Sequence, residues 1–228
     1  MNFTIYIIIT ALISYLIVLI YIKYFPTLDV PNKRSSHFKP TITGGGIGFV
    51  LTTFIFSLLA IYRKYLGANL FFIISLPLAI VVFYDDKLNL SKKFRFIIQL
   101  IVVCLMISCA INFRNSITMQ YFYNYENIFI LFIPILIFFG TGFINLINFM
   151  DGIDGLLSTT TSITFLYLGV FQDKFYFIIF GSLVAFIFLN WEPAKEFMGD
   201  IVSTYIGGLI LSAIYSAPTL ENAKILFY

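Results

Sequence analysis

Long uninterrupted apolar runs constrain this chain more than any other feature of its sequence. The stretch IFILFIPILIFF at residues 128–139 contains no charged side chain, and similar runs recur along the whole chain. Only 11% of the 228 residues are charged, whereas a soluble domain carries about 25%. Too few polar side chains are present to cover a surface in water, so the sequence predicts an integral membrane protein.

The apolar runs define about eight segments that could cross a bilayer as helices, for which roughly 20 apolar residues are needed. These segments are Asn2–Phe25, Gly46–Tyr62, Leu70–Tyr84, Phe94–Ile111, Ile128–Phe149, Ser158–Phe171, Phe175–Asn190 and Ile201–Ala217. The polar stretches between them are too short to fold alone. We therefore expect an all-α, polytopic membrane protein with a single domain over residues 1–228. The net charge of +3 is too small to indicate nucleic acid as a partner.

The charged residues predict which helix ends face the cytoplasm. If residue 1 lies outside, the inside segments are roughly 23–45, 85–95, 149–157 and 191–200, and this orientation satisfies the positive-inside rule. Most of the 14 basic residues then lie inside, namely Lys23, Lys33, Arg34, Lys39, Lys87, Lys92, Lys93, Arg95 and Lys195. So do His37 and most of the 11 acids, namely Asp29, Asp85, Asp86, Asp151, Asp154, Glu192, Glu196 and Asp200. Since acids contribute little to topology, this gathering predicts an active site on the cytoplasmic face of the inner membrane.

Two of the inside segments combine charge with features that suit phosphate chemistry. In the first, Lys33, Arg34 and His37 precede three consecutive glycines, a pattern that favours phosphate binding at a helix start. The alternative is a basic anchoring loop whose glycines allow close helix packing. In the second, the adjacent acids Asp85 and Asp86 repel each other, and a cation would relieve that repulsion. The alternative is a helix end paired with the lysines that follow.

The other two inside segments are richer in oxygen ligands. Asn145, Asn148, Asp151 and Asp154 recur every three residues, so a helical path would place them near one face. Their amide and carboxylate oxygens suit Mg²⁺, or hydrogen bonding to a sugar or base. In the last segment, NWEPAKEFMGD, the carboxylate of Asp200 stands near a helix start, where it could instead serve as a cap. Lys195 in that segment could instead serve only as one of the positive charges that keep the segment on the cytoplasmic side.

The four segments together resemble the polyprenyl-phosphate N-acetylhexosamine-1-phosphate transferases. The matching elements are RSSHFKPTITGGG, the Asp85–Asp86 pair with SKKFR, NFMDGIDGL and NWEPAKEFMGD. This family includes the phospho-MurNAc-pentapeptide translocase, and NFMDGIDG with NWEPAK is more similar to its O-antigen or capsule-initiating branch. The resemblance implies that a UDP-N-acetylhexosamine and undecaprenyl phosphate react with Mg²⁺, or Mn²⁺ in its place, to give UMP and an undecaprenyl-diphosphate sugar. The protein would act within the lipid bilayer. Whether it forms a homodimer is left open by the sequence.

The resemblance also implies roles for individual residues. Asp200, helped by Asn148, would bind the metal ion, and Asp85 with Asp86 would organise or deprotonate the lipid phosphate or share the metal. Asp151 and Asp154 would face the nucleotide or act catalytically. The expected substrate contacts are Lys33, Arg34, His37, Asn145, Asn148 and Lys195.

Two departures from the family pattern accompany this resemblance. Val202 stands where relatives carry a second glycine in Gly-Asp-x-Gly-Ser, which would stiffen the turn beside Asp200. The family also continues through further helices, so the chain is expected to lack the C-terminal helices of its relatives. Two other functions stay open, a catalytically inactive paralogue of the same fold and a membrane cation transporter.

Overall fold

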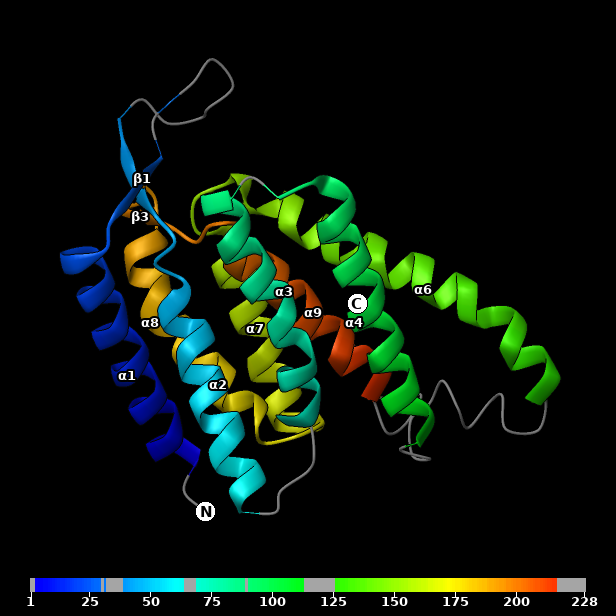
Figure 1. Ribbon diagram of the computed structural model, residues 1–228. Coiled ribbons are helices and arrows are strands. Elements are labelled where there is room, and N and C mark those ends of the chain that lie inside the picture. Colours follow the sequence, from blue (N-terminus) through cyan, green and yellow to red (C-terminus); the bar gives the residue numbers. More distant parts are fainter. Residues whose placement is uncertain are drawn as a thin grey trace.

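The described part of the chain is a bundle of long helices with a small sheet at one end (Figure 1). The computed structural model describes residues 3–29, 31, 39–63, 69–88, 90–112 and 126–216. Its α-helices are α1 (Phe3–Tyr24), α2 (Ile47–Tyr62), α3 (Asn69–Leu88), α4 (Lys92–Asn112), α6 (Glu126–Phe149), α7 (Leu156–Phe171), α8 (Tyr176–Asn190) and α9 (Asp200–Ser216). Each coincides with one of the eight apolar segments, because apolar runs of this length satisfy their backbone polar groups as helices.

Among the described residues, three helices are long and apolar enough to cross a membrane by themselves. Their spans are Thr4–Tyr24, Lys92–Ala110 and Leu131–Gly152. The other apolar helical stretches are shorter, at 10–17 residues. The prediction of an all-α membrane protein is therefore confirmed for the described residues, whereas the number of crossings stays a prediction.

Helix α9 runs through the middle of the bundle and is almost completely buried (Figure 1). It packs mainly against α3 and α6. Gly207 and Gly208 let these helices approach closely: a methyl group on Gly207 would lie 3.0 Å from the Ile144 backbone, and one on Gly208 would lie 2.6 Å from Leu78. Small residues at such contacts are how helices pack in membranes. This packing fixes the first residue of α9, Asp200, at one end of the bundle.

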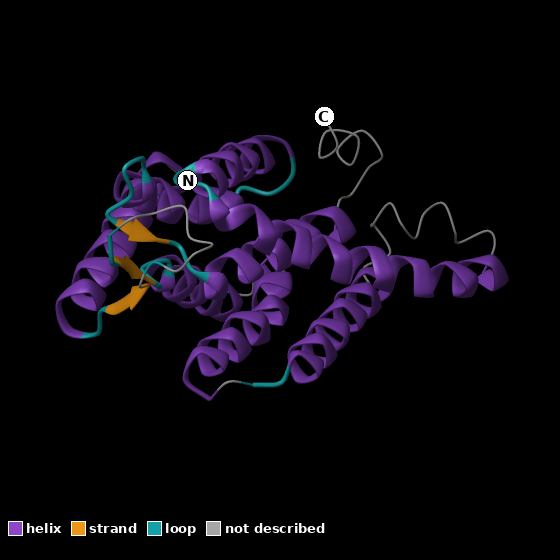
Figure 2. Cartoon of the chain, turned by 90° about the horizontal axis from the view of Figure 1, so that it is seen from above, coloured by secondary structure: helices purple, strands orange, loops and turns teal. Residues whose placement is uncertain are grey.

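A three-stranded sheet at that same end was not predicted from the sequence. Its strands are β1 (Thr27–Asp29), β2 (Thr41–Thr43) and β3 (Glu196–Phe197), and Figure 2 shows them beside one another over one end of the helices. β1 pairs with β2 in antiparallel fashion, whereas β2 and β3 are parallel, with Ile42 opposite Glu196. The sheet thus ties the segment before α2 to the segment before α9, although they are far apart in sequence.

Candidate active site

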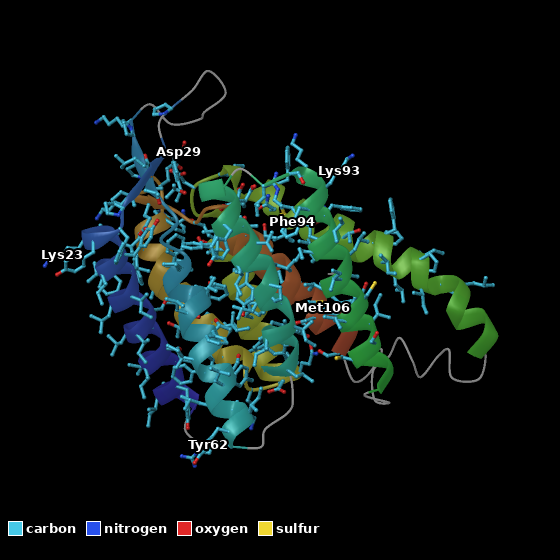
Figure 3. All side chains as sticks on the ribbon, in the orientation of Figure 1. Lys23, Asp29, Tyr62, Lys93, Phe94 and Met106 are labelled. Carbon is cyan, nitrogen blue, oxygen red and sulfur yellow. The ribbon has the colours of Figure 1, made fainter. Side chains whose placement is uncertain are left out.

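The predicted site residues that the structure describes gather at the sheet-bearing end of the bundle. Figure 3 labels Asp29, Lys93 and Phe94 at this end, Tyr62 at the opposite end and Met106 between them. Eight of the described helix termini meet here. They are the C-terminal ends of α1, α3, α6 and α8 and the N-terminal ends of α2, α4, α7 and α9. The alternation of helix directions brings together segments that the sequence separates.

The spacing of the amides and carboxylates from Asn145 to Asp154 predicted one helical path. The structure shows that this prediction was wrong, because the residues lie on more than one element. Helix α6 ends at Phe149 and is followed by a short 3₁₀ helix, η2 (Met150–Gly152). Gly155 then adopts a φ of +71°, which side-chain-bearing residues rarely adopt, and α7 begins. Asn145 and Asn148 therefore stand on α6, whereas Asp151 and Asp154 stand on the turn beyond it. The two amides and the two carboxylates therefore belong to different elements.

The amide of Asn190, at the end of α8, holds this turn against β3. Its Oδ1 accepts hydrogen bonds from the backbone N–H of Gly155 (3.2 Å) and the hydroxyl of Ser158 (2.9 Å). Its Nδ2 donates to the backbone carbonyl of Glu196 (3.1 Å). Nearby, the backbone N–H of Ala194 donates to Asp154 Oδ2 (3.0 Å). Because Asn190 is buried, these bonds have no competition from water and fix the turn in place.

Asp151 and Asp200 lie close enough for their charges to repel each other. The backbone N–H of Gly199, the glycine at φ +82° just before α9, hydrogen-bonds to the Asp151 carboxyl. Arg95 and Asp85 also lie within electrostatic reach of Asp200. Two carboxylates within electrostatic reach of each other form an arrangement that a divalent cation would stabilise.

A cleft of about 290 Å³, which we call the cationic cleft, opens between α3, α4, α6 and α9. Its polar lining consists of Lys92, Arg95, Gln99, Asn145, Asn148, Asp200 and Thr204. Arg95 Nη1 lies 2.7 Å from Asp85 Oδ2, and the amides of Gln99 and Asn145 form two mutual hydrogen bonds of 3.1 and 3.2 Å. Asp85 and the amide pair therefore restrain the side chains that line the cleft.

A larger cleft of about 990 Å³, which we call the acidic cleft, opens between the sheet, α1, α2 and the η2 turn. Its carboxylates are Asp29, Asp151, Asp154 and Asp200. The ring of Phe197 and the apolar side chains of Ile20 and Leu51 also line it. Asp200 lines both clefts, so the two meet at the start of α9.

The remaining predicted site residues do not all reach these clefts. Asn148 lines the cationic cleft, but its Oδ1 already accepts hydrogen bonds from the hydroxyls of Ser203 and Thr204. A metal ion on Asn148 would have to displace at least one of these hydroxyls. Lys195 is exposed and lines neither cleft. Lys33, Arg34, His37 and the side chain of Asp86 lie outside the described residues.

The oxygen ligands around Asp200 fit a Mg²⁺ ion that is shared between the protein and a bound phosphate better than they fit a metal ion bound by protein side chains alone. Among the residues that the structure describes, no group of three or more His, Cys, Asp or Glu side chains could hold a metal ion. Mg²⁺ is usually bound by one or two carboxylates together with substrate phosphates and waters. The carboxylates of Asp151 and Asp200, which line the same cleft, match this pattern, because a bound diphosphate would supply the remaining ligands.

Several residues of the clefts have no binding role that the sequence predicted. Lys92 and Arg95 were used for membrane orientation and as part of the SKKFR element, with no binding role, yet they stand on the first turn of α4 and line the cationic cleft. Gln99 follows Arg95 by four residues, the spacing that puts two side chains on one helix face. The position of Phe197 in the acidic cleft depends on β3, for which two residues of sequence give no signal.

Val202, the departure from the family pattern, is fully buried against the first turns of α2. A methyl group on Gly46 would lie 2.3 Å from Val202 Cγ2. The larger residue thus occupies the space that a glycine at position 46 leaves open, and α2 and α9 remain in close contact. The substitution is accommodated by packing beside the site.

The comparisons with known proteins agree on one kind of enzyme. Residues 68–217 match the model of glycosyl transferase family 4. An undecaprenyl-phosphate α-N-acetylglucosaminyl 1-phosphate transferase of Thermotoga maritima is 29% identical over 85% of this chain and 58% of its own length. A phospho-N-acetylmuramoyl-pentapeptide-transferase of Clostridium perfringens is 28% identical over 77% and 61%, respectively. The same enzyme of Caldanaerobacter subterraneus is 29% identical over 90% and 73%. The chain thus spans about three fifths of the first two relatives.

Proposed function

The chain belongs to glycosyl transferase family 4, and on this premise we propose that it transfers N-acetylhexosamine-1-phosphate from a UDP-sugar to undecaprenyl phosphate. The observation that carries the proposal is the meeting of the cationic and acidic clefts at Asp200. Phosphoryl transfer requires positioning and charge stabilisation more than covalent chemistry by the protein. A cleft lined by the basic side chains of Lys92 and Arg95, beside a pair of carboxylates, could provide both the positioning and the charge stabilisation.

In this proposal the cationic cleft holds the phosphate groups. Lys92 and Arg95 provide positive charge, and Arg95 is held in place by Asp85 at 2.7 Å. A guanidinium can bind phosphate through two parallel hydrogen bonds, which fixes the orientation of the phosphate as well as its position. Asp85 then acts by orienting Arg95, and Asp86 is the candidate base for the lipid phosphate.

Asp200 and Asp151 are the proposed metal ligands, and Asn148 joins them if its hydroxyl donors turn away. Mg²⁺, when bound, would neutralise the diphosphate and polarise the phosphoryl oxygen. The acidic cleft suits the nucleoside, because Asp154 offers a hydrogen-bond acceptor and Phe197 an aromatic ring. The sugar is an N-acetylhexosamine, as the family resemblance implies.

The proposal extends to the place of the protein in the cell. The eight helices cross the inner membrane with the sheet-bearing end in the cytoplasm, where UDP-sugars arise. The single domain of residues 1–228 would begin the assembly of O-antigen or another cell-surface polysaccharide. Lys33, Arg34 and His37 would add contacts to phosphate, Asn145 and Lys195 would contact the substrate, and two copies of the chain would form a homodimer.

The experiment is a transfer assay on membranes that contain the full chain. Labelled UDP-N-acetylhexosamine, undecaprenyl phosphate and Mg²⁺ are added, and UMP and lipid-linked sugar are measured. We expect both products, and we expect Asp200→Asn and Arg95→Gln to abolish or strongly reduce them, whereas Glu192→Gln, an exposed carboxyl in the same segment, should not. Folded protein that binds the UDP-sugar and forms no product would instead support the inactive paralogue.

The cation transporter left open by the sequence is the weaker alternative. Transporters of this kind place their ion ligands near the bilayer midplane, between facing helices. Here the described acids Asp85, Asp151, Asp154 and Asp200 stand at helix ends or on turns at one end of the bundle. Uptake of a cation by vesicles that contain the chain, with no transferase activity, would reverse this preference.

A further inference from the structure

Glu196, the first residue of β3, is buried without a partner for its charge. Its side chain is 0% exposed. Among the described residues, neither of its carboxyl oxygens has a hydrogen-bond partner. An ionised carboxylate in such a place is strongly disfavoured, so burial raises the pKa of Glu196 to about 8. The side chain lines neither cleft and has no role in the proposed transfer.

The Glu196 carboxyl lies in the contact between the segment before α2 and the segment before α9. A methyl group on Gly45 would lie 1.7 Å from Glu196 Oε1, so the carboxyl occupies the space that this glycine leaves open. On either side, β2 pairs with β3, and the backbone N–H of Gly44 donates to the Phe197 carbonyl at 3.2 Å. We call this contact, formed by residues 41–46 and 196–199, the seam.

Among the described residues, the elements packed against Glu196 provide no positive charge that would compensate an ionised Glu196 carboxylate. β2 carries no titratable side chain, and the end of α8 contributes only the Asn190 amide, which binds the Glu196 backbone carbonyl. On α1, the Tyr21 hydroxyl is engaged with Thr27 and Thr43. Of the titratable groups on the adjoining segments, Glu192 and Lys195 are exposed, and Asp154 accepts the Ala194 N–H. The carboxylates of Asp29, Asp151 and Asp200 line the acidic cleft, which Glu196 does not, and as acids they cannot compensate its charge.

We propose that Glu196 is a positioning residue that acts only when protonated: its neutral carboxyl closes the seam, and the closed seam holds Phe197 and Asp200 at the two clefts. Removal of the proton places an uncompensated charge between the strands, and the seam opens to let water reach it. The seam itself does not depend on the proposed function; only its effect on transfer does.

The direction of the pH effect follows from the proton count. At pH values below the usual glutamate pKa, the carboxyl is protonated whether the seam is closed or open. As the pH rises from there to about 8, only the closed seam keeps the proton, so the stability of the closed seam falls. The closed seam is therefore most stable in mildly acidic solution, and it opens as the pH rises toward about 8.

The chain carries its own reporter for this opening. Trp191 is its only tryptophan, follows Asn190 directly, and is 59% exposed. A methyl group on Gly155 would lie 3.5 Å from its ring, so the ring stands beside the turn that Asn190 ties to β3. The fluorescence of Trp191 in the full chain, in detergent, is recorded from roughly pH 6 to roughly pH 10, below the usual range of lysine.

We expect a fluorescence transition in the unaltered chain whose midpoint lies below the pKa of about 8 that the closed seam gives Glu196, because the closed seam loses no further stability above that pH. Glu196→Gln, which keeps the shape of the neutral carboxyl, should remove the transition, and Glu192→Gln should leave it unchanged. Under the transferase assay, Glu196→Gln should also retain activity at alkaline pH where the unaltered chain loses it. A transition that persists in Glu196→Gln, or no transition in the unaltered chain, would overturn the proposal.

A second measurement does not rely on a variant that folds. With ¹³C-labelled glutamate in the unaltered chain, infrared spectroscopy separates a protonated glutamic acid from the aspartates. We expect a protonated carboxyl band at neutral pH that disappears in alkaline solution. Its absence at neutral pH would show that Glu196 is ionised in the folded chain, and the proposal would be wrong. Neither readout needs catalysis, so failure of the transfer reaction would leave this test intact.

Discussion

At the scale of single residues, the site depends on charged side chains that are held by neighbours. Arg95 lies on the first turn of α4, is restrained by Asp85 and lines the cationic cleft. Lys93, two residues away on the same turn, is exposed and lines neither cleft. The two residues have the same charge and nearly the same position in sequence, so they form a matched pair for testing the cleft.

Arg95→Gln should lower kcat/KM for the UDP-sugar by about ten- to a hundredfold, because a hydrogen bond to a charged group contributes about 1.5–3 kcal/mol. Lys93→Gln should leave kcat/KM near the unaltered value. Steady-state kinetics on both variants, in the same detergent and at the same Mg²⁺ concentration, measure the difference. Equal losses in the two variants would mean that positive charge at the membrane surface matters and the cleft does not.

Asp200→Asn should raise the Mg²⁺ concentration needed for half-maximal transfer by at least about tenfold, since loss of even an outer-shell metal partner typically has that effect. The comparison is Asp154→Asn, whose carboxylate is already engaged by the Ala194 N–H. Titration of transferase activity with Mg²⁺ measures both. If only Asp154→Asn changes the Mg²⁺ requirement, the metal ligands have been assigned to the wrong carboxylate.

At the scale of elements, short turns and strands of two or three residues position the site, while the long helices provide the scaffold. Asn190 joins the end of α8, the turn before α7 and β3 through three hydrogen bonds. Gly45 and Glu196 join β2 to β3 by filling one space between them. These contacts connect segments that are distant in sequence, so each can be tested by removing one partner.

Asn190→Ala should lower the free energy of unfolding by at least about 2 kcal/mol, because it leaves buried donors and an acceptor without partners. Thermal unfolding in detergent measures the change. Trp191→Phe, at the exposed neighbouring position, is the control and should have little effect. An unchanged melting temperature for Asn190→Ala would mean that water or another side chain replaces the amide.

Gly45→Ala should destabilise the chain by about 1–3 kcal/mol, the usual cost of overpacking, because the added methyl meets the Glu196 carboxyl. The double variant Gly45→Ala/Glu196→Ala should lose less than the sum of the two single variants, since the smaller residue vacates that space. Gly142→Ala is the control, because nothing lies within 4 Å of an added methyl there. Strict additivity in the double variant would show that the two residues do not share a space.

At the scale of the whole molecule, helices of alternating direction form a bundle with two distinct ends, one that bears the sheet and one that lies opposite it. Lys93 and Asp29 lie at the sheet-bearing end, and Tyr62 lies at the other (Figure 3). If the sheet-bearing end is cytoplasmic, the exposed Arg63, next to Tyr62, faces the outside. Charge alone predicted this orientation, and the structure adds which residues are accessible enough to test it.

Arg63→Cys should react with a membrane-impermeant maleimide in intact cells, whereas Lys93→Cys should react only after the membrane is opened. Cys104 and Cys109 are replaced by serine in both variants, so that each protein has one thiol. The fraction of labelled protein, before and after permeabilisation, measures the orientation. Labelling of Lys93→Cys in intact cells would invert the proposed topology.

The sequence by itself determined the helices and the family. Apolar runs long enough for the bilayer have one way to satisfy their backbone, so all eight predicted segments match helices. The motifs around Asp85, Asp151 and Asp200 carried the resemblance that the family match confirms. Both properties are readable because they depend on local patterns along the chain.

Only the tertiary structure decided how the site is assembled. The break between Asn148 and Asp151, the pairing of β2 with β3, and the burial of Glu196 against Gly45 depend on contacts between distant segments. A two-residue strand has no periodicity to detect, and a glutamate in a polar segment looks exposed until its neighbours are known. Local pattern thus predicts which residues form helices, whereas the packing of their ends determines which side chains meet and which carboxyl is left without water.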